Sequence, residues 1–121
     1  MKKQLKTIYY VVLTFILAVA ILLIISIFPI TGNIKVLTVL SGSMEPAIHT
    51  GSVVVVKPIS NYEVGDIITF GPNTKTQIPT THRIVETRLQ DGQTIYKTKG
   101  DANNGEDTKE VLAKDIIGKV Y

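Results

Sequence analysis

The chain has 121 residues, of which 45% are hydrophobic and 19% charged, and it contains no cysteine. That length accommodates one domain, and the lack of cysteine excludes a disulfide scaffold, a thiol nucleophile and cysteine-ligated iron–sulfur or zinc sites. The formal net charge of +3 comes entirely from Lys2, Lys3 and Lys6, so the remainder is neutral and nucleic-acid binding is not indicated.

The first element in chain order is an apolar run from Ile8 to Phe28, interrupted only by Thr14 and Ser26. A helix of that length rises about 31 Å, which matches the ~30 Å hydrocarbon core of a bilayer. A secretory signal peptide usually has an apolar core of only about 7–15 residues. We therefore predict an uncleaved transmembrane helix over 8–28, ended by Pro29. A cleaved signal peptide and a buried soluble helix are the alternatives.

Lysines flank the apolar run unequally. Three precede it, whereas Lys35 alone follows closely. Segments rich in lysine and arginine next to a transmembrane helix stay on the cytoplasmic side. We therefore expect residues 1–7 in the cytoplasm and residues 29–121 outside it, as one extracytoplasmic domain anchored to a cell membrane by a single helix.

Short runs typical of β-strands follow the apolar segment and are separated by turn residues. The predicted strands are Val36–Leu40, Ser52–Lys57, Asp66–Phe70, Thr81–Leu89, Thr94–Lys99 and Ile116–Tyr121. Asp91-Gly92, within Gln90–Gln93, is typical of a tight hairpin turn. No later stretch has helical periodicity, so the predicted fold is mostly β, a small barrel or folded sheet directly behind one helix.

The segment Ser41-Gly42-Ser43-Met44-Glu45-Pro46 follows the first predicted strand and contains turn-forming glycine and proline. A serine in such a loop is ordinarily a polar turn residue, and it becomes a nucleophile only when a base lies nearby. The chain has two histidines that could serve. His49 lies in a turn, where we expect it to face solvent. His82 lies at the start of an alternating strand.

A third polar segment runs from Lys99 to Asp107, and its Asn/Asp/Gly composition predicts a loop. Calcium binding is one alternative, but position 12 counted from Asp101 is Leu112, where an EF-hand loop carries glutamate. A carboxylate of this loop, from Asp101 or Asp107, can instead orient an imidazole and stabilise its cation. The residues alone permit either aspartate in that role.

These pieces, in this order behind an N-terminal anchor, resemble signal peptidase I. More narrowly, they resemble the endoplasmic-reticulum-type branch found in archaea, in eukaryotic signal peptidase complexes and in some Gram-positive bacteria. The matching motifs are SGSMEP at 41–46, GSVVVVK at 51–57, VGDIITF at 64–70, HRI at 82–84 and KGDANN at 99–104, with Asp107 beyond. Each motif alone is weak, but five in the family's order and approximate spacing are a specific signal over residues 8–121.

The resemblance implies a membrane-anchored serine endopeptidase that removes signal peptides from exported proteins without a metal or organic cofactor. Ser43 matches the nucleophile, and His82 stands where the bacterial branch has a lysine base. Asp107 matches the third catalytic residue, and Asp101 matches the aspartate of the KGD motif, which supports the site. Ser41 matches a position whose hydroxyl helps the Ser43 backbone N–H to form the oxyanion hole.

The resemblance also implies how the domain binds its substrate and contacts the membrane. An extended signal peptide is expected along a sheet edge, with shallow pockets for small side chains at the first and third positions before the cut. The membrane-proximal face is expected to be apolar, with Pro46-Ala47-Ile48 as the candidate segment. The implied partners are preprotein signal peptides, the lipid bilayer and other secretion-pathway subunits.

Two other functions fit parts of the sequence. One is a non-enzymatic, membrane-anchored β module for binding or assembly. The other is a self-cleaving protease of the related repressor type, although those proteins lack an anchor such as 8–28. Many signal peptidases continue past the final strand, whereas this sequence stops at Tyr121. It is therefore either a minimal member or lacks part of the C-terminal region.

Overall fold

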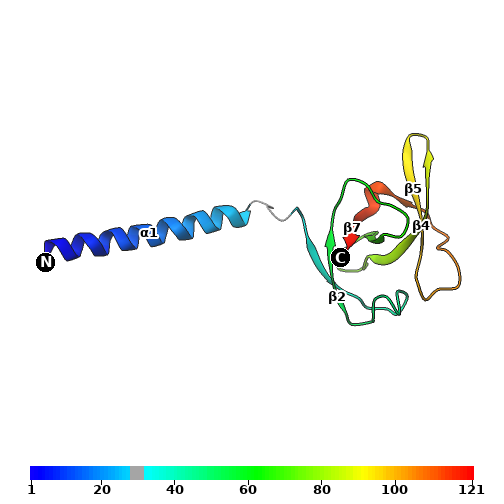
Figure 1. Ribbon diagram of the computed structural model, residues 1–121, viewed down its shortest axis with the longest axis horizontal. Helices are drawn as coiled ribbons and strands as arrows, with labels where there is room; N and C mark the ends of the chain where they lie inside the picture. The colour runs from blue at the N-terminus through cyan, green and yellow to red at the C-terminus, as the bar shows by residue number, and fades with distance from the viewer. Residues whose placement is uncertain (28–31) are drawn as a thin grey trace. The chain divides into compact units, whose positions relative to one another are not determined.

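The computed structural model describes residues 1–27 and 32–121 of the chain, in two compact units, Met1–Gly32 and Asn33–Tyr121 (Figure 1). The first unit contains one helix, α1, over Lys2–Ile27. None of its side chains is buried, and it is long and apolar enough to cross a membrane. The helix begins six residues before the predicted span because residues 2–7 contain no glycine or proline. The predicted stop at Pro29 lies outside the described residues.

The second unit is built from strands and one short 3₁₀ turn. Its elements are β1 (Lys35–Thr38), β2 (Val53–Lys57), β3 (Ile67–Phe70), β4 (Thr80–Gln90), β5 (Gln93–Lys99), β6 (Val111–Leu112), η1 (Ala113–Asp115) and β7 (Ile116–Val120). All six observed strand pairings are antiparallel and join the strands into one curled sheet of seven, in the order β1-β2-β7-β3-β4-β5-β6. The prediction of a mostly β domain behind one helix is confirmed.

Most predicted strands agree with the observed ones to within a residue or two. The predicted hairpin is also confirmed, because Gln90 pairs with Gln93 and both turn residues, Asp91 and Gly92, have positive φ angles of 50° and 76°. Figure 1 shows this β4–β5 hairpin projecting from the rest of the sheet. The prediction missed β6, whose two residues are too few to show alternation.

The core of the domain consists of two clusters of buried hydrophobic residues. One contains Met44, Ile48, Val54 and Val56, and the other contains Ile68, Ile84, Tyr96 and Val111. In β2, alternate valines are buried and the others exposed, as a strand with one solvent-facing side requires. The first cluster includes Met44, directly after Ser43, and the second includes Ile84, two residues after His82. Both predicted catalytic residues are therefore adjacent to packed core.

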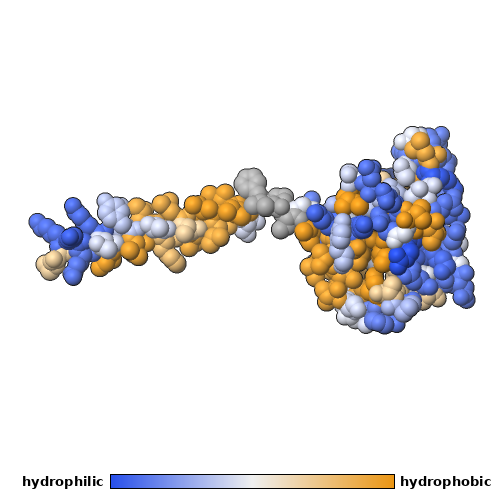
Figure 2. Space-filling model, in the orientation of Figure 1, coloured by the Kyte–Doolittle hydropathy of each residue, from blue (hydrophilic) through white to orange (hydrophobic). Residues whose placement is uncertain are grey.

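Exposed apolar side chains gather over β1 and β2, as Figure 2 shows. They include Val36, Val53 and Val55, and Leu40 follows β1. The prediction that Pro46-Ala47-Ile48 forms an apolar face is wrong for Ile48, which is buried in the first core cluster. Its backbone N–H donates to the Met44 carbonyl in a helical turn that directs the side chain inward.

Candidate active site

Ser43 lies in the loop between β1 and β2, in a turn that the hydrophobic core holds. The next side chain, Met44, is only 1% exposed and packs in the cluster with Val54 and Val56. Within the turn, the Glu45 N–H donates to the Gly42 carbonyl at 3.1 Å. Because Met44 is buried, the adjoining Ser43 cannot move freely, although its own side chain stays half-buried and accessible.

His82 comes from the start of β4, where it pairs in register with Ile68 of β3. The residue is 8% exposed, and its ring packs edge-on against Phe70, with centroids 6.3 Å apart. Its Nε2 atom lies 3.2 Å from Ser43 Oγ. The structure thus brings a histidine and a serine 39 positions apart in sequence within hydrogen-bond distance.

Asp107 completes a contiguous series. Its Oδ2 atom lies 2.6 Å from His82 Nδ1, and the same oxygen accepts a hydrogen bond from Thr98 Oγ1, also at 2.6 Å. A carboxylate accepts, so the proton of the neutral imidazole lies on Nδ1 and Nε2 is free to accept from the Ser43 hydroxyl. This arrangement allows an imidazole to remove the serine proton while the carboxylate stabilises the resulting cation.

Asp101 does not contact His82 but binds the neighbouring residue, Arg83, through both carboxylate oxygens. Arg83 Nε donates to Oδ1 at 2.9 Å and Nη2 to Oδ2 at 2.8 Å, while Nη1 donates to the Gly65 carbonyl at 2.8 Å. The hydrogen bonds that Arg83 donates to Asp101 lower the pKa of the Asp101 carboxyl below its usual value. Side chains alternate along a strand, so His82 and Arg83 of β4 engage two different aspartates of the same loop.

The loop that carries both aspartates also contacts the Ser43 turn directly through the backbone. The Ala102 N–H donates to the Ser43 carbonyl at 2.9 Å. This approach is possible because residue 100 is glycine: a Cβ there would lie 2.7 Å from the Ser43 carbonyl oxygen. Sequence reasoning assigned no role to Gly100, Ala102 or Arg83. The KGD and HRI motifs marked their neighbourhood, but nothing in the sequence showed what these residues touch.

Ser41 and His49 complete the set of residues singled out from the sequence. The Ser41 hydroxyl lies 3.2 Å from the Ser43 hydroxyl, on the exposed side of the turn. His49 has a different partner, and its Nδ1 lies 3.0 Å from Glu45 Oε2. That contact is the largest cause of a lowered pKa of Glu45, which also accepts from the Thr50 N–H at 3.2 Å. The expectation that His49 faces solvent is confirmed, because its side chain is 71% exposed.

A cleft of about 360 Å³ adjoins Ser43 and His82. Its walls are two chain segments, 37–41 and 78–82, with Met44, Val54 and Asn73 completing the lining. The first segment begins in the last two residues of β1 and runs beyond it. β1 lies at an end of the sheet order and pairs with β2 alone among the described strands. The cleft therefore joins an unpaired strand edge to the candidate nucleophile and base.

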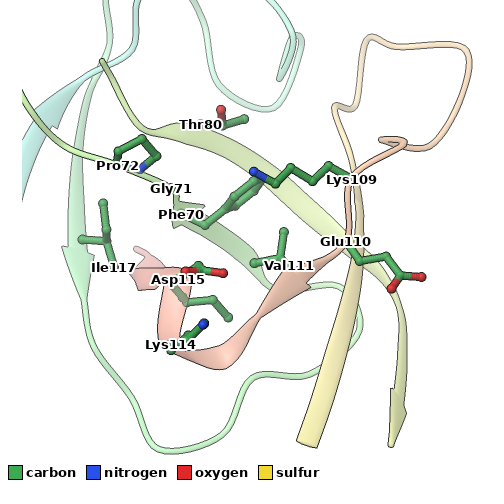
Figure 3. A pocket seen from close by; sticks show the side chains of 11 residues that line it. Phe70, Gly71, Pro72, Thr80, Lys109, Glu110, Val111, Lys114, Asp115 and Ile117 are labelled. Carbon is green, nitrogen blue, oxygen red and sulfur yellow. The ribbon is translucent and has the colours of Figure 1, made fainter. Parts of the chain in front are cut away.

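Another cavity, of about 500 Å³, shares Thr80 with the lining of this cleft, and its other described lining residues differ. Figure 3 shows its lining, which includes Phe70, Pro72, Lys109, Val111 and Lys114. None of the serine, histidine and aspartate residues predicted for the site lines this larger cavity. The candidate chemistry therefore belongs to the smaller cleft.

Residues 8–119 match the protein family described as signal peptidase, peptidase S26. A similar protein is Signal peptidase I W of Bacillus subtilis, 36% identical over 94% of this chain and 63% of that protein. The catalytic subunit SEC11 of the Eremothecium gossypii signal peptidase complex is 37% identical over 70% of this chain and 56% of that protein.

A human relative, Signal peptidase complex catalytic subunit SEC11C, is 32% identical over 98% of this chain and 68% of its own length. The chain thus spans less than two thirds of the Bacillus and Eremothecium proteins. The matched region includes every residue of the Ser43, His82 and Asp107 series, because the family match runs from residue 8 to residue 119.

Proposed function

Because the chain belongs to the signal peptidase family, peptidase S26, we propose that it is a membrane-anchored serine endopeptidase that cleaves signal peptides from exported proteins. The observation that carries the proposal is the hydrogen-bonded series Ser43–His82–Asp107, with 3.2 Å and 2.6 Å between successive partners. A non-enzymatic β module has no need for a hydroxyl, an imidazole and a carboxylate aligned in this way beside an open cleft.

In the proposed reaction, Ser43 Oγ attacks the scissile carbonyl carbon while its proton passes to His82 Nε2. Asp107 keeps the imidazole oriented and stabilises its positive charge. The Ser43 backbone N–H and the Ser41 hydroxyl donate to the oxyanion that forms. His82 then gives the proton to the leaving amine as the peptide bond breaks, which leaves the acyl group on Ser43. Water next attacks the acyl carbon while His82 takes its proton, and His82 returns that proton to Ser43 Oγ as the acyl group leaves. Asp101 acts at a distance, by fixing the loop that carries Asp107.

The proposed substrate is an extended peptide in the cleft between segments 37–41 and 78–82. An extended chain adds to an unpaired strand edge through backbone hydrogen bonds, and β1 offers such an edge. The cleft lining near Ser43 is largely apolar, with Leu37, Val39 and Ile78 among its residues. We propose small side chains at the first and third positions before the cut because the chain belongs to the signal peptidase family.

We further propose that α1 spans the bilayer with Lys2, Lys3 and Lys6 in the cytoplasm, which follows from the lysine asymmetry around it. The exposed apolar side chains on β1 and β2 give the domain a face suited to contact with lipid.

Partners are proposed on the names of the relatives. Two relatives are described as catalytic subunits of a signal peptidase complex. Other secretion-pathway subunits are therefore candidates for this chain, alongside preprotein signal peptides. Co-purification from a mild detergent extract would identify them, and a catalytic chain that elutes alone and cleaves alone would refute the need for such subunits.

The experiment that tests the proposed function uses the detergent-solubilised full chain and a preprotein. Sequencing the new N-terminus should reveal one cut directly after the signal peptide, and Ser43→Ala should abolish it. An active-site-directed acylating agent should label Ser43 in the unmodified protein. A folded protein that neither cleaves nor is labelled would favour the non-enzymatic module.

The proposed orientation has a separate test. A protease added outside right-side-out vesicles should digest the domain after residue 32 and leave the N-terminal lysines protected. Digestion of the N-terminus with protection of the domain would refute the orientation and, with it, the assignment to exported substrates.

A further inference from the structure

Asp107 accepts two short hydrogen bonds on one oxygen, and only one of them comes from the proposed base. His82 Nδ1 and Thr98 Oγ1 both lie 2.6 Å from Asp107 Oδ2. The resemblance to signal peptidases assigned no role to Thr98, and the proposed reaction does not use it. Its hydroxyl nevertheless contacts the carboxylate atom on which the orientation of the imidazole depends.

Thr98 is among the most deeply buried residues of the domain. It lies near the end of β5, pairs in register with Ile84 of β4 and has 0% exposure. Its β-branched side chain has few rotamers available in a strand. Its backbone carbonyl also accepts a hydrogen bond from the Asp107 N–H at 2.8 Å. Thr98 therefore holds Asp107 at two points, one on the backbone and one on the side chain.

Asp107 itself lies in a setting that does not fix its carboxylate. It follows the Asn103–Gly105 stretch of a loop, and its side chain is 24% exposed, so water can compete for its oxygens. The backbone bond to Thr98 fixes the position of Asp107 but leaves rotation of the side chain free. The Thr98 hydroxyl removes that freedom, since it can donate to Oδ2 only when this oxygen points toward β5 and His82.

We propose that Thr98 is a positioning residue of the active site, which acts through Asp107 to keep the His82 imidazole aligned with Ser43. This proposal rests on the proposed function and deepens it. The alternative is that the Thr98 hydroxyl merely needs a partner because it is buried, and uses Asp107 as the nearest one. The two roles differ in what happens when the hydroxyl is removed without changing the shape of the residue.

Two substitutions separate shape from hydrogen bonding. Thr98→Val keeps the branched shape and loses the hydroxyl, whereas Thr98→Ser keeps the hydroxyl and loses the methyl group. Loss of a hydrogen bond to a charged group predicts a fall of roughly ten- to a hundredfold in kcat for Thr98→Val, with KM little changed. Thr98→Ser should retain most of the activity although its smaller side chain leaves a gap and lowers the melting temperature more.

Thr69→Val is the matched control. Thr69 is also 0% exposed, and its hydroxyl lies 2.8 Å from Thr81 Oγ1 rather than from a residue of the catalytic series. It should lose stability as Thr98→Val does and keep kcat within a few-fold of the unmodified chain. In an Asp107→Asn background, Thr98→Val should cause little further loss, because both changes act on the same contact.

The measurements use the full chain in detergent, with cleavage of a signal-peptide substrate and thermal unfolding followed by circular dichroism. NMR of the His82 Nδ1 proton gives a readout that does not depend on cleavage. Its low-field signal should persist in Thr98→Ser and Thr69→Val and weaken or shift in Thr98→Val. Equal kcat and an unchanged proton signal in Thr98→Val would overturn the positioning role. Absence of cleavage by the unmodified chain would instead count against the proposed function, and the proton signal would still decide the role of Thr98.

Discussion

The close approach of Gly100 to Ser43 predicts that a single methyl group at residue 100 will displace Ser43, the proposed nucleophile. In Gly100→Ala, the new Cβ would lie 2.7 Å from the Ser43 carbonyl oxygen and 2.6 Å from Asn103 Nδ2. The Asn103 side chain can rotate away. The Ser43 carbonyl cannot, because it belongs to the backbone of the nucleophile and accepts the Ala102 N–H.

The size of the effect follows from the distances. Ordinary van der Waals contact begins near 3.4 Å, so a separation of 2.7 Å requires a movement of about 0.7 Å. A misplacement of about 1 Å can cost on the order of 10²-fold in rate. We therefore expect Gly100→Ala to lower kcat/KM roughly ten- to a hundredfold. The expected direction is a loss of kcat, because the Ser43–His82 geometry changes while most of the cleft does not.

Gly105→Ala provides the control in the same loop, since no atom lies within 4 Å of a Cβ at that position. It should cleave a signal-peptide substrate at nearly the unmodified rate. The double variant Gly100→Ala/Asn103→Ala removes the side-chain clash but not the backbone one, so it should remain slow. Circular dichroism melting verifies that each variant is folded. If folded Gly100→Ala matched Gly105→Ala in activity, the reasoning would be refuted, and rescue by the double variant would shift the cause to Asn103.

Three further predictions concern the charged residues around the nucleophile. His82→Ala should lower turnover by several orders of magnitude, whereas His49→Ala should stay within a few-fold in the same cleavage assay; equal losses would mean that the base is misassigned. Asp107→Asn should lower kcat by about 10³–10⁴-fold. Asp101→Asn should lower kcat less but reduce the melting temperature more, because Arg83 then loses its charged partner. The reverse ranking of the two variants would exchange the roles of the two aspartates. Arg83 lowers the pKa of Asp101 in the folded chain below its usual 3.8. As the pH falls, the Asp101 carboxylate therefore takes up a proton in the unfolded chain before it does so in the folded chain. The stability from Asp101 is therefore complete above that value and is lost as the pH falls through the lower folded-state pKa. Melting temperatures between pH 2 and pH 7 should fall less steeply on the acid side in Asp101→Asn, and identical slopes would contradict this.

The parts of the fold that could be predicted are those with a strong local signal. Alternating residues identified β4 and β5, and Asp91-Gly92 identified the turn between them. The two residues of β6 offered no such signal. Ile48 was assigned to an exposed apolar face because sequence shows that a residue is apolar but not which apolar residues the core will use. Its helical turn with Met44 decided that.

The candidate site depended on pairings that local sequence does not contain. Ser43 and His82 lie 39 positions apart and His82 and Asp107 lie 25 apart, so only the family resemblance suggested that they meet. The sequence alone allowed either Asp101 or Asp107 to face the His82 imidazole. The difference arises because the Asp107 N–H bonds to β5, whereas Asp101 is drawn to Arg83, which points to the opposite side of β4 from His82.

The position of β7 in the sheet bears on when the candidate site can form during synthesis. β7 follows the other six strands in sequence but lies between β2 and β3 in the sheet. Ser43 belongs to the β1–β2 side, and His82 and Asp107 belong to the β3–β6 side. A chain emerging from the ribosome therefore lacks the strand that joins the two sides of the sheet, one with the proposed nucleophile and one with the proposed base, until residues 116–120 arrive. Nascent chains halted before residue 116 should therefore react with an acylating agent at Ser43 more slowly than released chains do.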